Sequence, residues 1–423
     1  MTRADGNDFL PQYEPREALV SDFCQRNRLS PTALTELKNQ AGEQLPPFFS
    51  DMAWKAEDIQ SRHITFLSNS ERNEVSDACA AFVASGKSLN DLDKSLFPLP
   101  LLATRLAAIR KDLHQGLGLA VLRGIGRTNM STVAEIFTTF AGISSHIAPQ
   151  RAKQARNNMI VHITHMDKNS GSLPAPYLNG PLPFHTDPAA DVVAMFVIHP
   201  ASNCGGDGLF APVASIYNHL AATRPDLLHE LLKPDWPFAA TGSSQQQSNG
   251  DNGDADGNGL RRAVMFLSPI SGAPEMLFSR GALITRSHRA ISEKQNAALD
   301  AAHFAAETVA CRVQYHAGDL LFFNNRRILH AREGFTDNAM VPPHVDIGRG
   351  VVEGGDGGHD DINETKKRHM LRLWLGDREL AGTPPGQMLQ QVWRDAFDRN
   401  DDDHTSKPHV KKGGKWPAEP TCD

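Results

Sequence analysis

Apolar residues recur along this chain with two spacings, and each spacing predicts a different kind of element. Short runs of apolar and β-branched residues, several of them alternating with polar positions, predict strands. These runs lie at residues 119–122, 192–198, 264–267, 276–278, 309–315, 320–323, 328–330 and 370–375. Apolar residues three and four positions apart predict helices, at residues 101–114, 130–142, 213–232 (interrupted at Pro225) and 291–304. Since the strands outnumber the helices, we expect a mainly β domain with flanking helices.

Local signals support two of the helix ends. Ser292 and Gln295 form a capping-box pattern, with apolar Ile291 before it, so the last helix should begin there. Gly116 stands just after the first predicted helix and is placed to end it.

Composition divides the chain into a core and peripheral segments. Residues 1–97 are expected to be an N-terminal lead-in of helices and loops, and residues 98–397 a single domain. A low-complexity insertion rich in Gln, Asn, Asp and Gly is predicted at 242–259, a loop insertion at 338–363 and a disordered tail at 398–423. We find no internal repeat.

Composition also narrows the class of protein. With 423 residues, 40% of them hydrophobic, the chain can bury a substantial core. A formal net charge of −6 gives no reason to expect nucleic acid or an anionic membrane as a partner. No secretory signal or membrane-spanning run is visible, and five scattered cysteines suggest reduced thiols. We therefore expect a cytoplasmic protein, with homo-oligomerisation left open.

Four His-x-Asp triplets are candidates for part of a metal site, although about two His-x-acid triplets are expected by chance. His359–Asp361 lies in a glycine-rich loop, and His344–Asp346 has no partner histidine at a strand end downstream. His165–Asp167 ends an apolar run and is the main rival. His185–Asp187 precedes the apolar strand at 192–198, which would place the pair at the mouth of a barrel, and it is the preferred candidate.

A second candidate ligand is His330. The segment from Gly318 to His330 reads as turn, apolar strand, tight Asn-Asn-Arg-Arg reversal and second strand. Such an arrangement would bring the imidazole of His330 to the same barrel mouth. The alternative is a histidine at the end of a surface strand.

Arg372 lies among apolar residues in the last predicted strand. A guanidinium there would be costly to bury without a partner, so an anionic ligand is one explanation. The alternatives are that Arg372 extends to the surface or pairs with a structural carboxylate. Arg368, four residues earlier in the sequence, is the second candidate for binding an anion.

Together these three segments resemble the taurine/2,4-D dioxygenase (TauD/TfdA) family of Fe(II)/2-oxoglutarate oxygenases. The resemblance implies a double-stranded β-helix (jelly-roll) core of the clavaminate synthase-like kind. It implies Fe(II) held by His185, Asp187 and His330, which leaves coordination positions open for 2-oxoglutarate and O2. It also implies that Arg372, or else Arg368, binds the distal carboxylate of 2-oxoglutarate.

The implied reaction is oxidation of an unactivated C–H bond by hydroxylation, desaturation or cyclisation, with release of succinate and CO2. His162, Asn179 and Phe184 are candidates for the substrate pocket. Two departures from the family pattern stand out. Relatives often carry Thr or Ser after a Gly-Gly-Asp run, where this chain has Gly208. Taurine-specific enzymes carry an asparagine where this chain has Pro181, so we expect a substrate from secondary metabolism or amino acids rather than a sulfonate.

Two other classes stay open from the sequence. One is a cupin-like metal enzyme that does not use 2-oxoglutarate and needs no carboxylate-binding arginine. The other is a catalytically inactive jelly-roll that serves as a binding module. Formation of succinate from 2-oxoglutarate in the presence of Fe(II) distinguishes these classes from the oxygenase.

Overall fold

The computed structural model describes residues 30–32, 35–36, 45–59, 61–125, 132–154, 158–166, 174–238, 261–280, 283, 291–337 and 367–398. The insertions predicted at 242–259 and 338–363 lie outside these residues, as does the predicted tail after its first position. The same is true of His344–Asp346, His359–Asp361 and Asp167.

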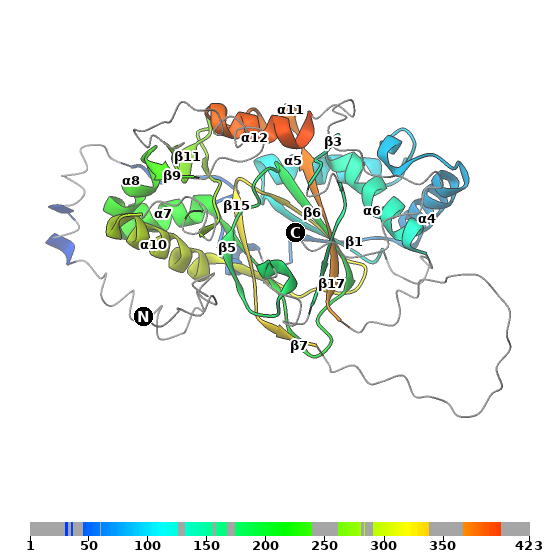
Figure 1. The fold of residues 1–423 in the computed structure, drawn as a ribbon, viewed down its shortest axis with the longest axis horizontal. Coiled ribbons are helices and arrows are strands. Elements are labelled where there is room, and N and C mark those ends of the chain that lie inside the picture. Colours follow the sequence, from blue (N-terminus) through cyan, green and yellow to red (C-terminus); the bar gives the residue numbers. More distant parts are fainter. Residues whose placement is uncertain are drawn as a thin grey trace, which may run out of the picture.

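Two β-sheets packed face to face form the centre of the molecule (Figure 1). The larger has seven strands in the order β1-β2-β14-β6-β17-β3, with β4 also paired to β17, and the smaller has four in the order β13-β8-β15-β5. The strands of the larger sheet are β1 (Ile64–Phe66), β2 (Leu119–Arg123), β3 (Gln150–Arg151), β4 (Val161–Thr164), β6 (Val192–His199), β14 (Leu320–Asn324) and β17 (His369–Gly376). Those of the smaller are β5 (Leu182–His185), β8 (Gly208–Pro212), β13 (Cys311–Val313) and β15 (Ile328–Arg332).

Helices cover the outer face of each sheet, which gives four layers (Figure 1). The larger sheet is covered by α4 (Asn69–Ala84), α5 (Ala103–Gln115) and α6 (Val133–Ile147), and the smaller by α7 (Val213–Thr223), α8 (Pro225–Leu232) and α10 (Glu293–Val309). The other described elements are α3 (Ala56–Ile59), α11 (Arg378–Ala381), α12 (Gln387–Phe397), η1 (Leu89–Asp91), η5 (Ala175–Tyr177), β7 (Cys204–Gly205), β9 (Trp236–Pro237), β10 (Arg261–Arg262), β11 (Met265–Leu267), β12 (Pro274–Met276) and β16 (Phe335–Thr336).

Strand β6 explains why the sheets take these positions. Successive side chains of a strand point to opposite faces of the sheet. Ala194 and Phe196 pack with the helices of the outer layer, while Val193 and Met195 pack against the smaller sheet. A strand that is apolar on both faces is typical of the middle of a layered domain, and β6 indeed lies between β14 and β17.

The predicted fold class is confirmed, with differences at element ends. The helix expected at 130–142 begins at Val133, because Thr132 caps it and forms a capping box with Glu135. The capping box at Ser292 is present, and its helix continues to Val309. The strand expected at 276–278 lies at Pro274–Met276. The lead-in also contributes a strand, since β1 pairs in parallel with β2.

The lead-in is packed onto the domain through an aromatic contact. Phe97 is fully buried, and a Cβ atom built on Gly142 of α6 would lie 2.5 Å from its ring. Only a glycine at this helical position leaves room for the ring. The contact therefore ties the end of the lead-in to the helical layer.

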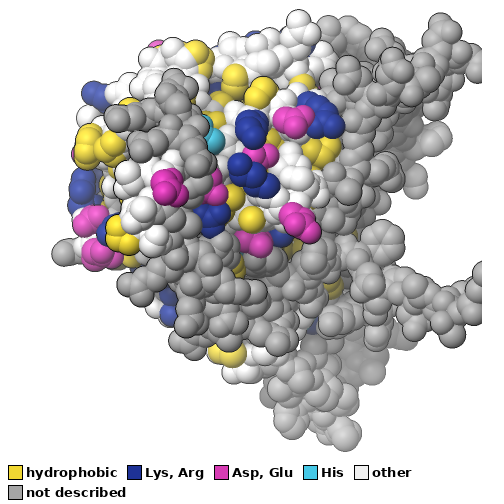
Figure 2. Space-filling view, turned by 90° about the vertical axis from the view of Figure 1, so that its left-hand side faces the viewer, with side chains coloured by type: hydrophobic (Ala, Val, Ile, Leu, Met, Phe, Trp, Pro, Cys, Tyr) yellow, Lys and Arg dark blue, Asp and Glu magenta, His cyan; other side chains and the backbone are white. Residues whose placement is uncertain are grey.

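Charged side chains of both signs share one face of the molecule. On the face drawn in Figure 2, basic and acidic side chains of the described residues are interspersed. This agrees with the weak net charge of −6. Within the part of the chain that the structure describes, no helix has the length and apolar character to cross a lipid bilayer.

Candidate metal centre

The loop after β5 positions two of the three candidate ligands. His185 is the last residue of β5, and Asp187 follows two positions later. Between them, Thr186 hydrogen bonds through its hydroxyl and amide to the backbone of Phe278, at 2.8–3.2 Å. This anchor holds the loop so that the side chains on either side of Thr186 turn into the space between the sheets.

The third ligand comes from the neighbouring strand. His330 lies in β15 and is the register partner of His185 in β5. Their ring centroids are 4.1 Å apart. Ile328, two residues before His330, belongs to the cluster between the sheets, so the alternation of the strand turns His330 to the same side.

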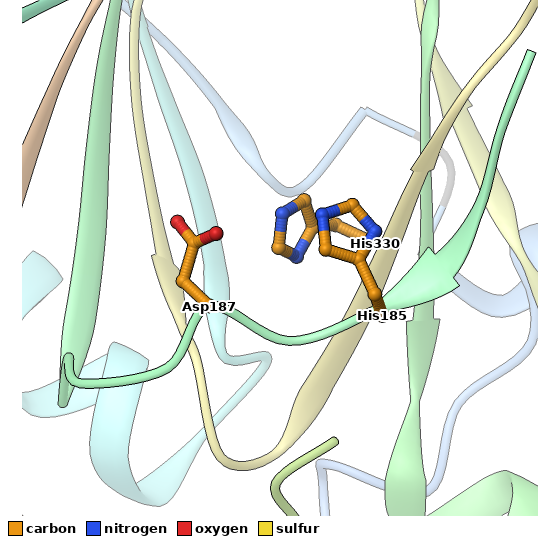
Figure 3. A group of neighbouring side chains, drawn as sticks. All are labelled: His185, Asp187 and His330. Carbon is orange, nitrogen blue, oxygen red and sulfur yellow. The ribbon is translucent and has the colours of Figure 1, made fainter. Parts of the chain in front are cut away.

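His185, Asp187 and His330 form a compact cluster, as Figure 3 shows. One ligand atom of each residue lies within 4.8 Å of the other two. Nδ1 of His185 donates to the carbonyl of Pro183 at 2.8 Å, which leaves Nε2 as a lone-pair donor. Nδ1 of His330 is buried without a hydrogen-bond partner among the described residues. Two imidazoles and one carboxylate on one side of an ion is the ligand set of non-haem Fe(II) oxygenases.

The electrostatics of the cluster suit a cation. Burial lowers the pKa of both His185 and His330 below the ordinary value, so neither ring is protonated near neutral pH. Burial by itself raises the pKa of Asp187, but Arg372, the two imidazoles and the Trp374 hydrogen bond outweigh it and bring that pKa below its ordinary value. Neutral imidazoles and an ionised carboxylate are the forms that bind a metal.

Two residues of β17 hold the Asp187 carboxylate. Arg372 Nη1 lies 3.2 Å from Oδ1, and Trp374 Nε1 donates to Oδ2 at 2.8 Å. Arg372 also donates to Gln154 at 3.2 Å. Arg372 therefore lies at the metal end of the site and already has a carboxylate partner.

Asn325 fixes the backbone of the same loop, a role that the sequence did not reveal. Its side chain accepts from the Asp187 amide at 2.8 Å and donates to the carbonyls of Asp187 and Ala190 at 2.9 and 3.0 Å. Asn325 is fully buried in the reversal between β14 and β15. The Asn-Asn-Arg-Arg segment was predicted as a turn, but its contact with a loop far away in sequence carries no local signal.

A second buried group lies further along the space between the sheets. Arg368 is 3% exposed, and its Nη2 donates to the sulfur of Met370 at 2.7 Å. Its Nε, like that of Arg372, has no hydrogen-bond partner among the described residues. No carboxylate of these residues forms an ion pair with Arg368, whereas Arg372 is paired with Asp187. Arg332 is also buried, and donates to carbonyls of the segment before β5. Both guanidinium groups lie against the ring of Phe335, at 5.4 and 4.8 Å from its centroid.

The charges of these two arginines are poorly compensated. Burial lowers the pKa of Arg368 and outweighs the opposite effects of Tyr315 and Asp337, neither of which forms an ion pair with it. Burial together with the charge of Arg368 lowers the pKa of Arg332 to about 9. A buried cation without a counter-ion is costly. An anionic group bound between the sheets would remove that cost, so the chain fits both a metal and a carboxylate-bearing co-substrate.

Of the candidate pocket residues, two face away from the metal cluster. Phe184 packs with the helices outside the smaller sheet, because it alternates with His185 along β5. His162 lies against Phe137 of α6 and 2.9 Å from His369, on the helix side of the larger sheet. Asn179 accepts from the Phe335 amide at 3.0 Å, and so lies in the segment that Arg332 holds near the site.

The rival triplet is not part of the cluster. His165 lies 2.7 Å from Asp337, and that aspartate also accepts from the amides of Ser202 and Arg368. His165 thus helps to hold the beginning of β17 against Asp337, the residue after β16. The structure brings together the preferred pair and His330 instead.

Comparison with known proteins gives a family and two named relatives. The model of the family described as "Taurine catabolism dioxygenase TauD, TfdA family" matches residues 85–344. A taurine hydroxylase-like protein of Stachybotrys chartarum is 28% identical over 348 residues, which cover 79% of this chain and 82% of that protein. The FR-33289 synthase of Streptomyces rubellomurinus is 28% identical over 187 residues, which cover 43% of this chain and 54% of that protein.

Solved structures share the fold. An asparagine oxygenase with Fe(II), hydroxyasparagine and succinate has a TM-score of 0.53 at 15% identity, over 74% of this chain and 93% of that chain. The non-heme iron oxygenase OrfP with Fe and alpha-ketoglutaric acid has a TM-score of 0.52 at 13% identity, over 74% of this chain and 93% of that chain. At these identities the likeness concerns the fold.

Proposed function

Since the chain belongs to the TauD, TfdA family and is a 2-oxoglutarate-dependent non-haem iron dioxygenase, we propose that it oxidises an unactivated C–H bond of a small organic molecule and releases succinate and CO2. The observation that carries this proposal is the cluster of buried Asp187 with half-buried His185 and His330. Iron bound there, with 2-oxoglutarate and O2, would supply the oxidising chemistry. The protein supplies the position of the substrate and the exclusion of water.

Each residue of the cluster has a distinct task. His185 and His330 would bind the metal as neutral imidazoles, and Asp187 would add the one negative charge. Arg372 and Trp374 keep both carboxylate oxygens of Asp187 oriented, at 3.2 and 2.8 Å. Such partners of a metal ligand typically contribute 10–100-fold to metal affinity or activity.

The two candidate arginines differ in whether a carboxylate of the protein is already paired with them. Arg372 is paired with Asp187, whereas Arg368 is buried and has no carboxylate partner among the described residues. We therefore assign the distal carboxylate of 2-oxoglutarate to Arg368, the second candidate from the sequence, and the metal end to Arg372. Four residues along a strand span about 13 Å, so one site can place the two arginines at opposite ends.

The substrate class follows from the family and from one residue. Pro181 replaces the asparagine of taurine-specific enzymes, and structures of the same fold have hydroxyasparagine and (3S)-hydroxy-L-Arg as bound molecules. We propose an amino-acid-derived or secondary-metabolite substrate, and hydroxylation as its reaction.

The two assignments are tested together by binding and turnover. Purified protein with Fe(II), ascorbate and 2-oxoglutarate should form succinate, and amino acids that are substrates should accelerate it. Arg368→Ala should lower the affinity for 2-oxoglutarate by about 10²–10³-fold or more, since loss of a partner from a buried charge pair costs about 3–5 kcal/mol. It should leave iron affinity unchanged. Arg372→Ala should instead lower the affinity for iron. The opposite pattern would exchange the two roles.

A further inference from the structure

Gly208 is the residue at which this chain lacks the hydroxyl that relatives often carry. It begins β8 and pairs with Arg332 of β15. Its backbone is not in the left-handed region, so its conformation does not require glycine. A Cβ atom at this position would instead lie 2.0 Å from the hydroxyl of Tyr315 and 2.7 Å from the ring of Phe210. The Tyr315 hydroxyl therefore occupies the place where a side chain of residue 208 would begin.

That place is on the inner face of the smaller sheet. Phe210, two residues along the same strand, belongs to the cluster between the sheets, as does Tyr315 itself. Phe210 is also the register partner of the metal ligand His330. The hydroxyl thus lies over the strand that carries His330, about two residues, or ~7 Å, further along.

The surroundings of the Tyr315 hydroxyl are those of an anion site. Tyr315 is 7% exposed, and the charges that act on it are those of Arg368 and Arg332 and of Asp207 and Asp319. The two carboxylates are already paired, with Arg312 and Arg123. Both arginines lie beside the segment from Gly206 to Gly208, since Gly208 is the register partner of Arg332 and a Cβ atom on Gly206 would lie 3.5 Å from Cδ of Arg368. These are the two buried arginines that lie against Phe335. Burial raises the pKa of Tyr315 to about 12, so the phenol stays protonated at neutral pH and can donate a hydrogen bond.

We propose that Tyr315 is a co-substrate-binding residue whose hydroxyl, together with Arg368, holds the distal carboxylate of 2-oxoglutarate in place of a hydroxyl at position 208. The proposal rests on the proposed function of the site. Gly208 and Tyr315 then form a reciprocal pair: the tyrosine, two residues after the end of β13, supplies the donor, and the glycine leaves the space for it. A neutral O–H beside a guanidinium favours a carboxylate, because a hydrogen bond to a charged acceptor is stronger than one between neutral groups.

The test is a calorimetric titration of 2-oxoglutarate into the Fe(II)-loaded protein without O2. Tyr315→Phe should weaken 2-oxoglutarate by about tenfold or more, since a hydrogen bond to a charged group is worth that much. It should leave the affinity for 2-oxobutyrate, which lacks the distal carboxylate, and for Fe(II) unchanged. Tyr217→Phe removes a hydroxyl from a buried tyrosine in the helical layer outside the smaller sheet, and should alter none of these affinities.

The outcomes separate this proposal from the function it rests on. Normal 2-oxoglutarate affinity in Tyr315→Phe, with binding by the wild type, would overturn the role of Tyr315 alone. An equal loss of affinity for 2-oxobutyrate and for 2-oxoglutarate would also overturn it, because the tyrosine would then act at the metal end of the site. Absence of 2-oxoglutarate binding in the wild type would overturn both. Gly208→Ala gives a second arm, because its Cβ should displace the hydroxyl and weaken 2-oxoglutarate in the same way, with little further loss in the double variant.

Discussion

Replacing Asn325 with alanine should loosen the metal centre without removing a ligand. The change deletes three hydrogen bonds, of 2.8, 2.9 and 3.0 Å, to the backbone of Asp187 and Ala190. Each such bond contributes about 1 kcal/mol net, and unsatisfied buried groups add to the loss, so the free energy of unfolding should fall by about 3–4 kcal/mol. Since the loop that carries Asp187 then keeps only its anchor at Thr186, Fe(II) affinity should fall by about 10–100-fold.

Asn324→Ala is the matched control for this prediction. Asn324 begins the same reversal and makes hydrogen bonds of 3.1 Å to the amides of Arg326 and Arg327 and to the carbonyl of Leu113, and a longer one of 3.4 Å to Nδ1 of His114. It makes none to the ligand loop. Urea unfolding should show similar destabilisation of both variants, and metal titration of the folded proteins should show a loss only in Asn325→Ala. Equal iron affinity in the two variants would refute this role of Asn325.

Two further predictions concern stability. Burial by itself raises the pKa of Asp377, but the hydrogen bonds from Arg110 and His114 outweigh it and hold that pKa below its ordinary value. The stability that this carboxylate contributes is therefore present above about pH 4 and is lost as the pH falls further. Urea unfolding should show that Asp377→Asn is less stable than the wild type at pH 7 and that its stability falls less in acid. Equal acid sensitivity of the two proteins would contradict this. Gly142→Ala should lower the melting temperature by several degrees, because the added Cβ atom would lie 2.5 Å from the Phe97 ring. Such overpacking costs about 1–3 kcal/mol, which outweighs the gain of about 1 kcal/mol in helix propensity. An unchanged melting temperature would refute this prediction.

Much of the fold could be predicted because its signals are local. Strand β6 is apolar on both faces over its first seven residues, Val192 to Ile198, and the capping box at Ser292 marks a helix start without reference to the rest of the chain. The ligand pair His185 and Asp187 could be chosen over its rivals because a core strand follows it. These features depend on periodicity and on neighbours in sequence.

The rest of the site depends on contacts between distant segments. A β-bulge shifts the register between β5 and β15, and the alternation within β5 sends Phe184 outward. The choice between Arg368 and Arg372 depends on which of them Asp187 pairs with, across 185 residues of sequence. Likewise, the glycine at position 208 is explained only by the hydroxyl of Tyr315, which lies where a side chain of residue 208 would begin.

The most direct test of the central claim is succinate formation from 2-oxoglutarate, measured with and without Fe(II), in the wild type, Asp187→Ala and His165→Ala. We expect iron-dependent succinate formation by the wild type and by His165→Ala, whose histidine pairs with Asp337 outside the cluster. We expect none by Asp187→Ala, since two imidazoles alone would not hold the ion in an active geometry. Succinate formation by Asp187→Ala and its loss in His165→Ala would contradict the assignment of the metal centre.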